Sequence, residues 1–194
     1  TPELSLDLCR RDFTVNAMAY SETKGIIDLF GGERDLENGI IRCVGSPDER
    51  FTEDGLRILR ALRFASVLDF ELDADCADSV RRLRGLLGKI SRERIYTETT
   101  KLLLGKGARR ILSTFPEVIS FIFPSLTEEM ICRAAALVER CPRDAEMRYA
   151  VLLSELDAKE EERMISSMKP SRAVKNAVLR YSKYENYRNY LDSE

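Results

Sequence analysis

The chain has 194 residues and a net charge of −2; 44% of its residues are hydrophobic and 33% are charged, which is typical of a folded, soluble, helix-rich protein. No apolar run is long enough to cross a membrane, and the complete absence of histidine excludes hydrolases that rely on a histidine base. Five scattered cysteines without C-x-x-C spacing support neither a zinc site nor a disulfide framework, so a reducing, cytoplasmic setting is expected.

The first part of the chain favours short strands. Residues 13–20 alternate apolar and polar side chains, which predicts a strand, and residues 25–30 predict a second strand that closes a hairpin. A short helix near 33–37 and a third strand over 40–44 follow. Three short strands cannot bury both faces of a sheet, so we expect residues 1–50 to be the end of a domain that begins before this sequence.

From Thr52 onward the pattern is helical. Thr52 is a suitable N-cap for the first helix, and Glu53 and Asp54 place negative charge at its positive end. Glycines and prolines separate the later helices and give short connections, as in packed antiparallel helices. Residues 113–123 fit either a helix or a strand. The predicted helices cover residues 52–68, 74–84, 91–104, 106–113, 127–140, 144–156, 158–168 and 171–187.

A polar series recurs at every third residue of the first helix: Asp54, Arg57, Arg60 and Arg63. Asp54 and Arg57 lie one turn apart, which places a carboxylate acceptor beside a planar fork of donors. This pair is either a helix salt bridge or an edge that reads a planar polar ligand such as a nucleobase. For the pair taken alone, the salt bridge is the better interpretation.

A second polar group comes earlier, at the predicted start of a strand. Arg10, Arg11, Asp12 and Asn16 combine two guanidiniums, a carboxylate and an amide. These groups suit contacts to phosphate and sugar hydroxyls, although a set of charged residues at the start of a strand is the simpler interpretation.

Four segments, taken together in this order and spacing, closely resemble one family. They are Arg-Arg-Asp-Phe-Thr-Val-Asn-Ala-Met-Ala at 10–19, Asp-Leu-Phe-Gly-Gly at 28–32, Gly-Ile-Ile-Arg-Cys-Val-Gly at 39–45 and Phe-Thr-Glu-Asp-Gly-Leu-Arg-Ile-Leu-Arg-Ala-Leu-Arg-Phe-Ala at 51–65. The family is that of the class II nucleotidyltransferases, the bacterial CCA-adding tRNA nucleotidyltransferases and their poly(A) polymerase relatives. Ile-Ser-Arg-Glu-Arg-Ile at 90–95 is similar to the family's next motif, and the resemblance is weak beyond residue 105.

The resemblance implies an α+β fold in three parts. Residues 1–50 would be the end of a nucleotidyltransferase head of the DNA polymerase β type, residues 51–105 a neck that carries the nucleotide-template helix, and residues 106–194 part of a helical body. The implied enzyme adds C and A to the tRNA 3′ end from CTP and ATP, with no membrane partner; the oligomeric state stays open. Two carboxylates in a motif that precedes this region would hold Mg²⁺, so we expect no catalytic or metal-binding residue here and no activity from these residues alone.

The resemblance also assigns roles residue by residue. Arg11 would contact the incoming nucleotide, with Asp12 at its ribose, and Asp54 and Arg57 would form a protein template for the base. The implied nucleotide-binding set is Arg11, Asp12, Asn16, Asp54, Arg57, Arg60 and Arg63. Cytosine and adenine each offer an amine donor beside a ring-nitrogen acceptor, which matches a carboxylate next to a guanidinium, whereas guanine and uracil have the wrong polarity.

Several alternatives stay open at this point. The same motifs fit a poly(A) polymerase or an enzyme that adds only A or only CC. A non-catalytic helical RNA-binding module is an alternative from another class. Four basic residues, which we call the basic cluster, either meet tRNA phosphates or form a solvated helix face. They are Lys101, Lys106, Arg109 and Arg110.

Overall fold

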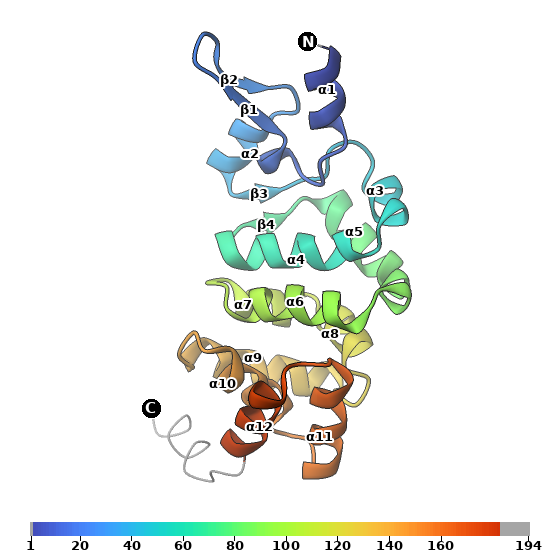
Figure 1. Ribbon diagram of the computed structural model, residues 1–194, viewed down its shortest axis with the longest axis vertical. Coiled ribbons are helices and arrows are strands. Elements are labelled where there is room, and N and C mark those ends of the chain that lie inside the picture. Colours follow the sequence, from blue (N-terminus) through green and yellow to red (C-terminus); the bar gives the residue numbers. More distant parts are fainter. Residues whose placement is uncertain (1, 183–194) are drawn as a thin grey trace.

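The computed structural model describes residues 2–182 as an elongated stack of short helices with a small β-containing part at its N-terminal end (Figure 1). That part holds helix α1 (Pro2–Cys9), a 3₁₀ turn η1 (Thr14–Asn16), strands β1 (Met18–Ser21) and β2 (Gly25–Asp28), and helix α2 (Gly32–Asn38). The α+β class expected from the sequence is confirmed. Helix α1 was not predicted from its short, weakly patterned sequence.

Strands β1 and β2 form the predicted antiparallel hairpin, with Tyr20 opposite Ile26. The expected strand over 13–20 is wrong in its first half, where the chain turns as η1. Two side chains explain the turn: the Thr14 hydroxyl donates to Asp35 Oδ2 at 2.7 Å, and Asn16 Oδ1 accepts from the Phe13 N–H at 3.2 Å. These local bonds compete with an extended backbone.

Strand β3 (Ile40–Ile41) pairs in parallel with β4 (Glu71–Leu72), and the pair joins the β-containing part to the helices (Figure 1). Strand β4 corrects the expectation of a helical pattern from Thr52 onward, in which only residues 113–123 also fit a strand; at two residues β4 is too short to show an alternating pattern. The Arg42 guanidinium supports the same junction, because it forms ion pairs with Asp35 and Asp73.

The predicted helix over 52–68 is two helices, α3 (Pro47–Glu53) and α4 (Leu56–Leu68), so Thr52 lies inside α3 and caps nothing. Asp54 has extended dihedrals, φ −146° and ψ 105°, and its Oδ1 accepts from the Leu56 N–H at 3.0 Å. Gly55 follows because a Cβ there would lie 2.9 Å from Leu86 Cβ. The break is therefore built from a capping carboxylate and a residue without a side chain.

The remaining helices confirm the predictions closely, and residues 113–123 prove largely helical. Several helices begin at side-chain caps, such as Ser91, Thr127 and Asp144, whose oxygens accept from first-turn amides. The part of the predicted 171–187 helix beyond residue 182 lies outside the described residues. The elements are α5 (Ala74–Leu83), η2 (Arg84–Lys89), α6 (Arg92–Leu103), α7 (Ala108–Thr114), α8 (Pro116–Ile122), α9 (Glu128–Arg140), α10 (Ala145–Leu153), α11 (Ala158–Ser167) and α12 (Arg172–Tyr181).

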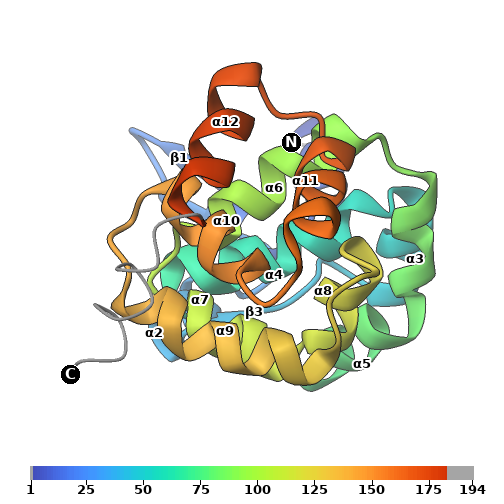
Figure 2. The ribbon, with the colours of Figure 1, turned by 90° about the horizontal axis from the view of Figure 1, so that it is seen from below.

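Viewed along the long axis, α4 and α6 lie near the centre and α3, α5, α9 and α12 lie around them (Figure 2). Helix α4 buries Ile58, Leu59 and Leu62 completely. Its Ser66 hydroxyl donates to the Leu102 carbonyl of α6 at 2.6 Å. None of the helices described is long and apolar enough to cross a lipid bilayer.

Arg148 of α10 ties the middle of the stack together although it is only 4% exposed. Its guanidinium donates to the carbonyls of Leu103 and Gly105 at the end of α6, and to those of Cys141 and Pro142 after α9. A cation at the carboxyl ends of two helices is favoured by their dipoles and satisfies carbonyls that the helices leave open.

We expect Arg148→Met to lower the free energy of unfolding by about 2–4 kcal/mol, because it leaves buried carbonyls without a donor. Urea denaturation measures this. Arg143→Met, at an exposed arginine in the loop just before α10, is the matched control and should change little. Equal losses in the two variants would show that the carbonyl contacts of Arg148 are unimportant.

Candidate functional site

The Asp12 carboxylate lies where the β-containing part meets α4. It sits in the loop between α1 and η1, and its two oxygens face two guanidiniums of α4. Arg57 Nε lies 2.9 Å from Oδ1, and Arg60 reaches Oδ2 at 2.5 Å. The structure thus brings together three predicted site residues, Asp12, Arg57 and Arg60, which we call the Asp12 cluster. The side chains of Asp12 and Arg57 are only 14% and 15% exposed, so this ion pair is partly shielded from water.

Arg57 also connects α4 to α3 and to the loop after α1. It pairs with Glu53 Oε2 at 2.5 Å and donates to the Arg50 carbonyl of α3 at 3.2 Å and to the Arg10 carbonyl at 3.4 Å. Hydrogen bonds from Arg57, and then from Arg50, lower the pKa of Glu53, so that carboxylate stays ionised beside the cluster. Arg57 is therefore fixed in orientation before any ligand arrives.

Asp54 does not pair with Arg57, so the salt-bridge interpretation of these two residues is wrong. Asp54 is extended between α3 and α4, whereas Arg57 already lies within α4, so the two are not successive members of one helical face. The Asp54 Oδ2 instead lies 3.0 Å from the guanidinium of Arg94 on α6. That ion pair is half-exposed, which makes it weak and readily exchanged.

Arg63 faces a different neighbour, one turn further along α4. Its Nε lies 2.8 Å from Glu98 Oε2 on α6, and its guanidinium stacks on the Phe64 ring at 3.7 Å. Burial, the largest influence, lowers the pKa of Arg63 below its ordinary value. In this arrangement Arg63 joins α4 to α6 and does not contact Asp12.

Arg11 and Asn16 complete the predicted nucleotide-binding set, and their side chains point in different directions. The Arg11 guanidinium is 51% exposed and pairs with Asp7 of α1 at 2.9 Å. Hydrogen bonds from Arg11 and then Arg10 lower the pKa of Asp7. Asn16 instead points its oxygen back to its own loop, where it holds η1 in place.

Two residues with contacts at this site, Glu53 and Arg94, were not among the nucleotide-binding residues predicted from the sequence. Glu53 stands four residues before Arg57, a spacing that indicates a helical ion pair and could have been used. Arg94 lies inside the motif at 90–95, yet nothing local shows that it reaches Asp54, forty residues earlier.

The basic cluster is only partly assembled. Lys106, Arg109 and Arg110 line one open hollow of about 480 Å³, whereas Lys101 does not. Arg109 pairs with Glu139 at 2.5 Å and Arg110 with Asp69 at 2.8 Å, so two of the three lining cations have acidic partners.

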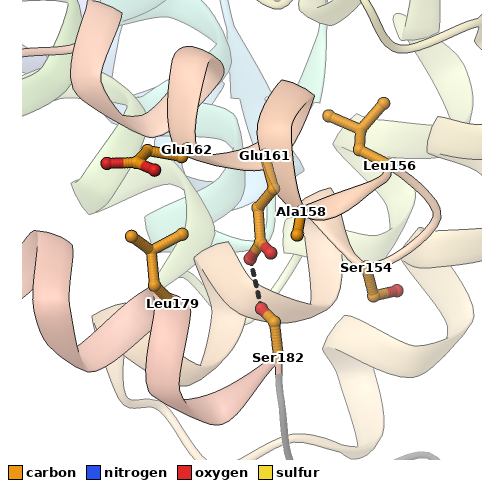
Figure 3. A pocket seen from close by; sticks show the side chains of 7 residues that line it. All are labelled: Ser154, Leu156, Ala158, Glu161, Glu162, Leu179 and Ser182. Carbon is orange, nitrogen blue, oxygen red and sulfur yellow. Dashed lines mark hydrogen bonds between the residues drawn. The ribbon is translucent and has the colours of Figure 1, made fainter.

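Another hollow, of about 220 Å³, lies among α10, α11 and α12, where Glu161 accepts a hydrogen bond from the Ser182 hydroxyl (Figure 3). It contains none of the predicted site residues. Helices α11 and α12 lie at the opposite end of the molecule from α1 (Figure 1). Within residues 2–182, no group of three or more acidic or cysteine side chains converges to hold a metal ion.

Two family models match the chain and together cover more than half of it. Residues 1–42 match the "Poly A polymerase head domain", and residues 69–130 match the "Probable RNA and SrmB- binding site of polymerase A". Both agree with the family that the sequence motifs resemble.

Curated proteins and solved structures agree with the models. A CCA-adding enzyme of Ligilactobacillus salivarius is 44% identical over 136 residues, which is 70% of this chain and 34% of that protein. The Bacillus stearothermophilus CCA-adding enzyme in complex with CTP superposes with a TM-score of 0.78 at 34% identity, over 90% of this chain and 45% of that one.

A tRNA nucleotidyltransferase complexed with a primer tRNA and an incoming ATP analog has a TM-score of 0.75 at 28% identity, over 98% of this chain and 62% of that one. The chain thus spans about a third to under two thirds of the length of these relatives.

The two carboxylates of the site should differ in their contribution to stability. We expect Asp12→Asn to lower the free energy of unfolding by about 1–2 kcal/mol, because it leaves the shielded Arg57 guanidinium and the partly exposed Arg60 guanidinium without their carboxylate. Asp54→Asn should cost less than about 0.5 kcal/mol, because asparagine keeps the cap on Leu56 and loses only a half-exposed ion pair. Chemical denaturation of both variants makes the comparison, and the reverse order would contradict this account of the junction.

Proposed function

This chain belongs to the family of bacterial CCA-adding tRNA nucleotidyltransferases and poly(A) polymerases, and on that premise we propose that its protein adds C and A to the 3′ end of tRNA from CTP and ATP. The observation that carries the proposal is the α3–α4 break, which leaves the Asp54 carboxylate with the half-exposed partner Arg94, while Asp12 holds the Arg57 guanidinium three residues further along the chain. Two of the relatives described above carry the name CCA-adding enzyme, which favours this activity over poly(A) addition.

In the proposed complex, Asp54 and Arg57 read the edge of the base. Asp54 Oδ2 accepts from the exocyclic amine of cytosine or adenine, and the Arg57 guanidinium donates to the neighbouring ring nitrogen or carbonyl. Guanine and uracil meet these groups with the opposite polarity and leave them unpaired, which rejects those bases. To read a base, Asp54 exchanges its half-exposed partner Arg94 for the amine.

The Asp12 cluster and Arg11 receive the rest of the nucleotide. Asp12 is an acceptor for ribose hydroxyls, and Arg11 and Arg60 are exposed enough to meet the triphosphate. In the structure described, Asp12 and Asp7 balance these guanidiniums. An incoming triphosphate would replace part of this negative charge, because its oxygens accept charge-assisted hydrogen bonds from guanidiniums. Asn16 supports the loop that presents Asp12, and Arg63 supports α4.

Mg²⁺, which the family resemblance implies, has no ligand set among the described residues. We propose that carboxylates outside the given sequence hold it. The bound ion would supply charge stabilisation for attack of the tRNA 3′-hydroxyl on the α-phosphate. The 194 residues alone are then expected to choose a nucleotide without joining it.

The three proposed parts are a head segment (1–50), a neck (51–105) and a body (106–194). The β3–β4 pair crosses the first boundary, so the head segment and neck share a hydrogen-bonded junction. The proposed setting is the cytoplasm, which suits a protein whose five cysteines are all free thiols.

We expect Asp54→Ala combined with Arg57→Ala to reduce discrimination against GTP and UTP about tenfold or more, because the template edge is removed. Incorporation of CTP, ATP, GTP and UTP is compared in the protein as its gene encodes it. The single variant Asp54→Asn keeps the fold of the break but adds an amide donor, so it should relax selection towards uracil.

A matched control removes another Asp–Arg pair from the same region. Arg82 of α5 pairs with Asp48 of α3 at 2.8 Å, away from the Asp12 cluster. Asp48→Ala with Arg82→Ala should leave base selection unchanged. Unchanged selection in both Asp54 variants would refute the template role.

We propose that the lining residues of the 480 Å³ hollow, Lys106, Arg109 and Arg110, meet tRNA phosphates. Lys106→Ala and Arg109→Ala should each weaken tRNA binding and reduce the slope of log K against log salt by about 1. The control is Arg133→Ala, because Arg133 is similarly exposed and pairs with Glu155 at 2.5 Å as Arg109 pairs with Glu139. An equal effect of the control would show that the hollow has no special role.

A further inference from the structure

Two buried thiols meet at the junction between the β-containing part and the helices. Cys43 follows β3 and Cys76 lies in the first turn of α5, and their sulfurs are 3.8 Å apart. Their exposed fractions are 3% and 0%, so each is shielded from other proteins. From the geometry of this pair and of the segments that carry it, we propose that Cys43 and Cys76 form a reversible disulfide under oxidation and that this bond restrains the loop that presents Asp12.

The distance between the sulfurs is short enough for the reaction. A disulfide requires about 2.05 Å, so the sulfurs have to approach by roughly 1.8 Å, which small rotations about the Cα–Cβ bonds and slight backbone adjustments provide. Both residues stand next to well-anchored positions, since Asp73 donates its N–H to the Ile41 carbonyl at 3.0 Å just before α5. The two segments are thus already held side by side.

A hollow at the surface brings a small oxidant up to Cys43. Cys43 lines a hollow of about 250 Å³ together with Thr14, Arg42, Gly45 and Asp73. The pKa of the Cys76 thiol is raised, first by its hydrogen bond with Cys43 and then by burial, so Cys76 stays protonated. Cys43 is therefore the sulfur that reacts first, and Cys76 resolves the product.

The chemistry balances with hydrogen peroxide as the oxidant. The Cys43 sulfur attacks one peroxide oxygen, the O–O bond breaks, and Cys43 sulfenic acid and water form. The Cys76 sulfur, as it loses its proton, then attacks the Cys43 sulfur; the S–OH bond breaks, the hydroxide takes the proton and leaves as water, and the S–S bond forms. Two thiols and one peroxide give one disulfide and two waters, and dithiothreitol reverses the change.

Cys43 is directly connected to the nucleotide-site loop. Phe13 and Cys43 form a β-bridge, with Thr14 N–H donating to the Arg42 carbonyl at 2.9 Å and Val44 N–H donating to the Asp12 carbonyl at 3.2 Å. A covalent bond from Cys43 to α5 therefore restrains the backbone of Asp12. Because a bound nucleotide has to rearrange the partners of Asp12, the restraint opposes binding; this last step rests on the proposed function.

The test oxidises the protein, as its gene encodes it, with hydrogen peroxide and maps its tryptic peptides. The expected product links peptides 43–50 and 64–81, with a mass lower by two hydrogen atoms than the reduced pair. Cys43→Ala and Cys76→Ala should each abolish the linked peptide, whereas Cys132→Ala, at an exposed thiol, should not. Absence of the link in the unaltered protein, or crosslinks only between molecules through Cys9 or Cys132, would overturn the proposal.

The effect on the site is measured separately, with CTP titrated into the oxidised and reduced forms. We expect oxidation to weaken CTP binding about fivefold, the lower end of ordinary coupling between two sites, and dithiothreitol to restore it. A linked peptide with unchanged CTP affinity would contradict the coupling to the site. Failure of the reduced form to bind CTP would contradict the proposed function instead, since the linked peptide is scored without nucleotide.

Discussion

The Asp12 carboxylate, shared between Arg57 and Arg60, is the interaction on which the arrangement of the site depends. It joins a loop of the β-containing part to the first buried helix of the stack, and the contacts of Arg57 extend the junction to α3. A carboxylate and a guanidinium that are both largely shielded cost desolvation free energy, and only close pairing offsets it. The pair therefore holds the orientation of Arg57 and also keeps a strong donor in place for a ligand.

The α3–α4 break determines what this donor can be used for. Had residues 52–68 formed one helix, Asp54 and Arg57 would lie on one face and neutralise each other. The extended Asp54 and the tightly packed Gly55 separate them, and Asp54 reaches Arg94 across to α6 instead. One group is thus fixed while the other has an exchangeable partner. This combination suits the proposed selection between bases by hydrogen bonding: the fixed guanidinium would set the polarity of the edge, and the carboxylate would become available when a base displaces Arg94.

Much of the helical architecture could be predicted, and the physical reasons are local. Ser91, Thr127 and Asp144 cap their helices within a few residues, and prolines and glycines end them, so a window of the sequence contains the whole signal. Strand β4 had no such signal, because two residues show no period and its partner residues in β3 lie 31 positions earlier. The η1 turn depends on Asp35, twenty-one residues after Thr14, and was equally hidden.

At the candidate site, too, one part could be predicted from the sequence and another part could not. The residue types at Asp12, Asp54, Arg57 and Arg60 indicated a nucleotide site through the motifs they belong to. Their partners could not be predicted, because the one-turn rule for Asp54 and Arg57 assumes an unbroken helix. Arg94 and Arg148 each have a partner forty or more residues earlier in the chain, Asp54 and Leu103, and only folding brings these residues together.

A crystal structure of the protein with bound CTP is the decisive measurement. We expect Asp54 Oδ2 at hydrogen-bond distance from the cytosine amine, the Arg57 guanidinium on the ring nitrogen or carbonyl, and Arg94 released from Asp54. Cytosine bound elsewhere, with the Asp54–Arg94 pair intact, would contradict it.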